Sequence, residues 1–117
     1  MKTAGVKCES DGKVMTVTID GDIDHHSAKY IREQIDKAIF YCRPKEMIME
    51  LGGVSFMDSS GLGLILGRFT KMRELGGKLI LSNPTKQTEK ILSLAGIGKL
   101  IEIIRGEKTP TSGKAKA

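Results

Sequence analysis

The 117-residue sequence is poor in aromatic residues, with no Trp, two Tyr and three Phe. The hydrophobic core must therefore be built from Ile, Leu, Val and Met. The same scarcity argues against nucleic-acid binding, because single strands are commonly held by aromatic side chains that stack on the bases. The net charge of +5 does not alter this, because four of the basic residues lie in residues 105–117 rather than in a patch on the main part of the chain.

Cysteines and long apolar runs are also scarce. Cys8 and Cys42 are too few for a disulfide framework and have no metal-site spacing, and Cys8 alternates with Val6 as a core residue of a strand would. No apolar run approaches the roughly 18 residues of a membrane span, and the first residues lack the features of a signal peptide. We therefore expect a soluble, cytoplasmic protein with no membrane or nucleic-acid partner.

The pattern of apolar residues predicts strands that alternate with helices. A β-hairpin is expected first, because two alternating stretches flank the turn pair Asp11-Gly12. Helical spacing and breaker residues then define the later elements. The expected strands are 6–10, 13–20, 46–51, 78–83 and 100–105, and the expected helices are 26–41, 61–75 and 85–94.

The order ββαβαβαβ predicts one α/β domain over residues 1–105. Its β-sheet should be mixed, with an antiparallel N-terminal hairpin and the remaining strands parallel through right-handed crossovers. Residues 106–117 are rich in Gly, Pro, Ser and Lys. This composition predicts a disordered basic tail.

The segment FMDSSGLG places three possible helix caps in a row, Asp58, Ser59 and Ser60. One cap is enough to begin a helix, and Asp, Ser and Thr are the usual residues there. Simple capping by one of the serines, with Asp58 favoured by the helix dipole, is the structural explanation. The redundancy instead favours a chemical role for one of the hydroxyl groups.

The helix that follows has an unusual pattern of glycines. At 100° per residue its apolar stripe is expected to comprise Leu62, Ile65, Leu66, Phe69 and Met72. Leu64 should then point outward between Gly63 and Gly67. A glycine inside a helix costs about 1 kcal/mol, so the two glycines indicate either tight packing on the sheet or a flat strip for another protein.

The segments GDIDHH and VSFMDSSGLGLILGRF closely resemble bacterial anti-sigma factor antagonists, which are single-domain members of the STAS group. The second segment is long and gapless, and the DHH residues make the chain most similar to the sporulation branch. The resemblance covers residues 5–105 and implies a STAS-like domain. Such proteins commonly end in a further helix, which the composition of this tail does not indicate.

The resemblance implies a switch at Ser59. In the family, an anti-sigma factor that is also a serine kinase phosphorylates this serine with ATP bound to the kinase, and a serine phosphatase reverses the reaction. The unphosphorylated antagonist binds the anti-sigma factor and releases the sigma factor. The chain itself is then expected to be no enzyme and to need no cofactor or metal. The expected partner-binding residues are Asp24, Asp58, Ser60, Gly61, Gly63, Leu64 and Gly67.

Two alternatives remain open from the sequence. The acids Asp20, Asp22, Asp24 and Asp58 follow strands, as in a receiver domain that binds Mg²⁺ and is phosphorylated on aspartate, here Asp58. Turn and cap chemistry explains the same acids. A STAS domain can also serve as a scaffold or regulatory module in another signalling assembly. A serine hydrolase is disfavoured, because no glycine stands two residues before Ser59 as a nucleophile elbow requires.

Overall fold

The computed structural model describes residues 4–106 and confirms the predicted order of elements. Five strands and three helices follow one another as ββαβαβαβ, with a short 3₁₀ helix, η1, before the last strand. The elements are β1 (Gly5–Asp11), β2 (Val14–Ile23), α1 (His25–Cys42), β3 (Glu46–Met57), α2 (Ser59–Glu74), β4 (Lys78–Ser82), α3 (Lys86–Leu94), η1 (Ile97–Lys99) and β5 (Glu102–Ile104).

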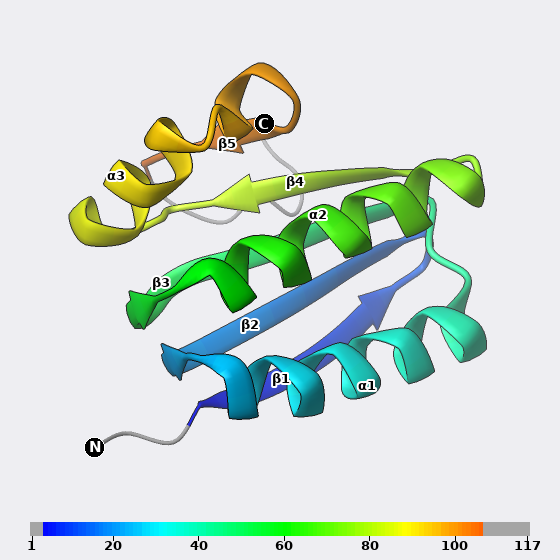
Figure 1. Ribbon diagram of the computed structural model, residues 1–117. Helices are drawn as coiled ribbons and strands as arrows, with labels where there is room; N and C mark the ends of the chain where they lie inside the picture. Colours follow the sequence, from blue (N-terminus) through cyan, green and yellow to red (C-terminus); the bar gives the residue numbers. More distant parts are fainter. Residues whose placement is uncertain (1–3, 107–117) are drawn as a thin grey trace.

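The strands form one sheet in the order β1-β2-β3-β4-β5. β1 pairs with β2 antiparallel, and the other neighbours pair parallel, so the predicted mixed sheet is confirmed. Figure 1 shows α1 and α2 side by side across one face of this sheet. The third helix, α3, follows β4, and its cap Thr85 donates a hydrogen bond to the Val54 carbonyl of β3. None of the helices within residues 4–106 combines the length and hydropathy needed to cross a membrane.

The hairpin loop is one residue later than predicted. Asp11 still pairs with Val14, so the loop consists of Gly12 and Lys13 rather than of Asp11 and Gly12. Gly12 has a φ of 66°. A two-residue hairpin loop needs a left-handed residue at its first position, and glycine meets this requirement without strain.

β3 is twice as long as the predicted strand 46–51, because two irregularities let it continue beside β2. The register shifts after Thr18 and again after Gly21, and each shift places one extra residue in β3. Gly53 lies at the first irregularity, where a Cβ would overlap with the carboxylate of Asp20. The GGVSF segment is therefore a bulged strand and not the expected turn and exit.

The core lies between the sheet and the two helices that cover it. It consists of Ile, Leu, Val and Met, as expected from the scarcity of aromatic residues. The fully buried side chains are contributed mainly by β2, β3 and α1. They include Met15, Val17 and Ile19 of β2, Met47, Met49 and Leu51 of β3, and Ile31 and Ile35 of α1.

The predicted apolar face of α2 is correct for Ile65 and Met72, which are fully buried, and for Leu62 and Phe69, which pack against the core, but it is wrong for Leu64 and Leu66. Leu64 is 4% exposed and Leu66 is 36% exposed, so the outward position assigned to Leu64 belongs to Leu66. The buried residues of the helix are Gly61, Leu64, Ile65, Arg68 and Met72. The sequence of α2 allows two overlapping apolar stripes, one with Leu66 and one with Leu64. The neighbouring helix α1 selects the second, because it covers the side of α2 that carries Leu64.

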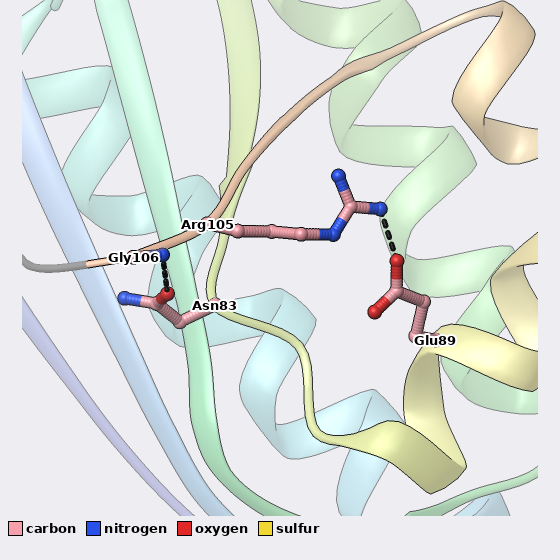
Figure 2. A network of polar contacts seen from close by, with 4 residues as sticks. All are labelled: Asn83, Glu89, Arg105 and Gly106. Atoms are coloured by element: carbon pink, nitrogen blue, oxygen red, sulfur yellow. Dashed lines mark hydrogen bonds and ion pairs between the residues drawn. The ribbon is translucent and has the colours of Figure 1, made fainter.

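The end of β5 is fastened to the preceding elements by polar contacts. The backbone N–H of Gly106 donates to Oδ1 of Asn83 at 2.9 Å, and Arg105 forms an ion pair with Glu89 of α3 (Figure 2). Asn83 has a φ of 50°, a conformation that asparagine tolerates better than most residues. The predicted disordered tail lies outside the described residues, except for Gly106.

The difference in burial between Leu64 and Leu66 should be visible in unfolding experiments. Leu64→Ala should lower the free energy of unfolding by about 2–4 kcal/mol, because it leaves a cavity between α2 and the core. Leu66→Ala, the matched control, should cost less than about 1 kcal/mol. Urea denaturation of both variants measures this, and a larger loss for Leu66→Ala would contradict the described packing.

Candidate functional site

The two helices that cover the sheet begin at the same edge. Ile23 pairs with Met57, so β2 and β3 end side by side, and the backbone N–H of Asp58 donates to the Ile23 carbonyl at 3.2 Å. Asp24 precedes α1 and Asp58 precedes α2. The parallel strands thus bring together two aspartates that are far apart in sequence.

Asp58 is the cap of α2. Its backbone is extended, and its Oδ1 accepts the N–H of Ser60 at 2.8 Å. Ser59 and Ser60 are the first two residues of the helix, so the possible capping role of either serine is not observed. The side chain of Ser59 is exposed and forms no hydrogen bond with any residue among 4–106. The Ser59 hydroxyl is therefore accessible and is not needed to begin the helix.

Asp24 caps α1 in the same way. Its Oδ1 accepts the backbone N–H groups of Ser27 and His26, each at 3.0 Å, while Ser27 Oγ accepts the N–H of Asp24 in return. The Ser27 N–H bond is the main cause that lowers the pKa of Asp24. The carboxylate therefore remains charged to lower pH than an ordinary aspartate. Asp24 therefore lies at the same edge of the sheet as Ser59, and its side chain caps α1.

A groove of about 480 Å³ runs between α1 and α2. The lining comes from residues 25–32 of α1 and residues 60–68 of α2, and Ser60 and His25 lie at its end near Ser59. The α1 wall consists of His25, Ala28, Lys29 and Arg32, and the α2 wall consists of Ser60, Gly63, Leu64, Gly67 and Arg68. The expected strip of Gly63, Leu64 and Gly67 is therefore a wall of this groove, with Leu64 largely buried, and not a flat outer surface.

The three glycines of α2 have different surroundings. A Cβ on Gly61 would overlap with the side chain of Met57 and would lie 3.3 Å from Ile23. Gly61 is buried and serves the packing of α2 on the strand ends, so its surroundings lend no support to the expected partner contact. A Cβ on Gly63 or Gly67 would meet nothing within 4 Å. Tight packing on the sheet therefore does not explain these two glycines.

An ion pair joins α1 and α2 at the end of the groove that is farther from Ser59. Nε of Arg68 on α2 lies 3.2 Å from Oδ1 of Asp36 on α1, and the Arg68 side chain is 9% exposed. Nε and Nη1 of Arg68 form no hydrogen bond with the described residues. Burial lowers the pKa of Arg68, the charge of Asp36 opposes this, and nearby Arg32 adds to it. The pair thus compensates the buried guanidinium only in part.

The basic wall on α1 was not predicted from the sequence. His25, Lys29 and Arg32 are spaced four and three residues apart, which places them on one helical face. This spacing was a readable signal. Only the structure shows that these exposed side chains line a groove together with Gly63 and Gly67 of α2.

The receiver-domain alternative finds no support in the architecture. Receiver domains have the strand order 2-1-3-4-5, whereas the order here is 1-2-3-4-5 with an antiparallel first pair. Within residues 4–106, no three His, Cys, Asp or Glu side chains are grouped so that they could hold a metal ion. Asp24 and Asp58 are occupied as helix caps.

Comparison with protein families places the chain in a known group. Residues 6–109 match the STAS domain, and the chain belongs to this family. It is 38% identical over 86 residues to the anti-sigma F factor antagonist of Lysinibacillus sphaericus, which covers 74% of each chain. It is 31% identical over 102 residues to the corresponding protein of Paenibacillus polymyxa, covering 87% of each. The resemblance to sporulation-type anti-sigma factor antagonists is thus confirmed.

Solved structures agree with this assignment. The anti-sigma factor antagonist SpoIIAA in its unphosphorylated form superposes with a TM-score of 0.78 at 30% identity, covering 89% of this chain and 90% of that one. The phosphorylated form of the Bacillus protein gives a TM-score of 0.72 at 30% identity, with coverages of 89% and 93%. The predicted fold class is confirmed.

The ion pair between the helices can be tested by removing its acid. Asp36→Ala should lower the free energy of unfolding by about 1–3 kcal/mol, because it leaves a buried guanidinium with no counter-charge. Glu33→Ala, on an exposed position of the same helix, should change it by less than about 0.5 kcal/mol. Adding Arg68→Met to Asp36→Ala should recover stability. Equal losses for Asp36→Ala and Glu33→Ala in urea denaturation would contradict the pairing.

The glycines of α2 should respond to alanine in opposite directions. Gly63→Ala and Gly67→Ala should each stabilise the protein by about 0.5–1 kcal/mol, because the added methyl meets no atom and alanine favours the helix. Gly61→Ala should destabilise it by about 1–3 kcal/mol through overlap with Met57. Thermal and urea unfolding measure the three variants. A destabilisation by Gly63→Ala as large as that by Gly61→Ala would contradict the open space described beside Gly63.

Proposed function

We propose that this chain is an anti-sigma factor antagonist that is switched by phosphorylation of Ser59. In the unphosphorylated state it binds an anti-sigma factor that is also a serine kinase, and the sigma factor is released. The kinase transfers phosphate from its own bound ATP to Ser59, and a serine phosphatase removes it. The chain contributes no catalytic residue or cofactor and works in the cytoplasm.

The observation that carries this proposal is the position of Ser59. Its hydroxyl is exposed on the first residue of α2, while Asp58 provides the helix cap. A serine that is accessible and has no structural task can be modified without loss of the fold. The names of the relatives, anti-sigma F factor antagonists, support the same function.

The physical effect of a phosphate at this position favours a switch at the interface. Phosphorylation adds about 1.5–2 negative charges, which the helix dipole stabilises by only about 0.3–1 kcal/mol. The folded domain should therefore tolerate the modification. Both forms of SpoIIAA resemble this chain closely, with TM-scores of 0.78 and 0.72, which supports a modification that leaves the fold in place.

A bound partner should not tolerate the phosphate. The new charge and volume would lie beside the carboxylate of Asp58, in the middle of a surface that includes Asp24, Ser60 and the groove. A loss of about 3 kcal/mol at the interface weakens binding more than a hundredfold, since about 1.4 kcal/mol corresponds to tenfold. Within this surface Gly63, Leu64 and Gly67 provide the groove wall on α2.

Substitutions of Ser59 test the switch. Ser59→Ala should bind the anti-sigma factor of the same genome as tightly as the unmodified protein and resist inactivation by kinase and ATP. Ser59→Asp should bind more weakly because of its negative charge, by about tenfold or more, with an unchanged melting temperature. Calorimetric titration measures both.

A matched control carries the same substitution on a distant exposed serine. Ser93→Asp on α3 should retain the affinity of the unmodified protein. Mass mapping after incubation with the kinase and ATP should locate the phosphate on Ser59. Phosphate on Ser60 instead, or equal affinities of Ser59→Ala and Ser59→Asp, would reject the proposed function.

A further inference from the structure

The groove between α1 and α2 is strongly basic. His25, Lys29 and Arg32 line it from α1, and Arg68 lines it from α2. None of the residues that line the groove is acidic. The acids near it lie at its two ends: Asp36 pairs with Arg68 at one end, and Asp24 and Asp58 cap the two helices at the other. An anionic group that entered the groove would therefore meet basic side chains on both walls.

The guanidinium of Arg68 lies at the base of the groove, where an anionic group would contact it. Its side chain is 9% exposed, its Nε faces Asp36 Oδ1 at 3.2 Å, and its Nη1 has no hydrogen-bond partner among the described residues. A buried guanidinium with unsatisfied nitrogens is costly. Asp36 already supplies one counter-charge at 3.2 Å from Nε, and a carboxylate at the base of the groove would add a second acceptor for this guanidinium.

The α2 wall permits the approach of another polypeptide. Gly63 and Gly67 are one helical turn apart, and a Cβ on either would meet only open space. Glycine lowers the stability of a helix relative to alanine. No close contact within residues 4–106 requires glycine at these two positions. Bare backbone on one face of a helix lets a second backbone approach closely.

The dimensions and location fit a short segment of a protein partner. From Ser60 to Arg68 the wall extends about 12 Å at 1.5 Å per residue. This length accommodates about four residues of extended chain. Ser60 and His25 place one end of the groove next to Ser59. A protein that docks over Ser59 would therefore reach the groove directly.

We propose that the groove binds an acidic segment of the anti-sigma factor, with Lys29 and Arg32 pairing with its carboxylates and Arg68 binding one at the base. The inference rests on the proposed function, because that function supplies the partner. Charge complementarity determines the chemistry of the segment, and the two open glycines favour a polypeptide over a small anion.

Charge reversal on α1 tests the proposal with a control on the same helix. Lys29→Glu and Arg32→Glu should each weaken binding of the anti-sigma factor of the same genome by about 30-fold or more, because an acidic segment would then face a like charge. Lys37→Glu makes the same change in net charge at an exposed position outside the groove and should alter the affinity by less than about threefold. Titrations at low and high salt should show a smaller salt dependence for the groove variants than for Lys37→Glu.

A substitution that fills the groove without changing its charge provides a second, independent test of the proposal. Gly67→Gln should fill the groove and weaken binding about tenfold without lowering the melting temperature. Thr70→Gln, on an exposed position of the same helix, should leave the affinity unchanged. Circular dichroism and melting temperatures ensure that all variants are folded.

The outcomes separate this inference from the function on which it rests. If Lys29→Glu and Arg32→Glu behave like Lys37→Glu while Ser59→Asp still weakens binding, the acidic-segment proposal is wrong and the proposed function stands. If the unmodified protein fails to bind the anti-sigma factor, both are overturned. Weak binding by the groove variants alone, with retained affinity of Lys37→Glu and Thr70→Gln, supports the inference.

Discussion

The arrangement of the site depends on one alignment, the pairing of Ile23 with Met57 at the end of two parallel strands. The bulges in β3 make this alignment possible, because they let the strand continue to the same edge as β2. The hydrogen bond from Asp58 to the Ile23 carbonyl fixes the two chain segments where the helices begin. The positions of both caps, of Ser59 and of the groove between the helices follow from it.

The polar residues at this edge have separate roles, and the proposed modification of Ser59 would therefore leave both helix caps in place. Asp58 and Asp24 cap the helices through hydrogen bonds to backbone N–H groups. Ser59 is left with an exposed hydroxyl. A modification there changes the charge of the surface while the core, built of aliphatic side chains and Met, is untouched. The same surface continues into a basic groove whose buried Arg68 is only partly compensated.

The sequence predicted much of this architecture and missed part of it for identifiable reasons. The element order and mixed sheet followed from strand and helix periodicity, because Ile31 and Ile35 or Met15 and Val17 repeat at clear intervals. The bulges in β3 were not readable, because Gly52 and Gly53 signal a turn as well as a bulge. The face of α2 was misassigned because periodicity gives relative angles, whereas the choice between Leu64 and Leu66 depends on where α1 packs. The pairing of Arg68 with Asp36 joins residues on different helices and leaves no local signal.

The central claim is that a phosphate on Ser59 abolishes docking without refolding the domain. The most direct measurement is the affinity of the protein, stoichiometrically phosphorylated at Ser59, for its anti-sigma factor, compared with that of the unphosphorylated protein and accompanied by amide NMR spectra of both forms. The account predicts an affinity at least about a hundredfold lower, with spectral changes confined to the start of α2 and its neighbours. Equal affinities, or shifts that extend throughout the sheet, would contradict it.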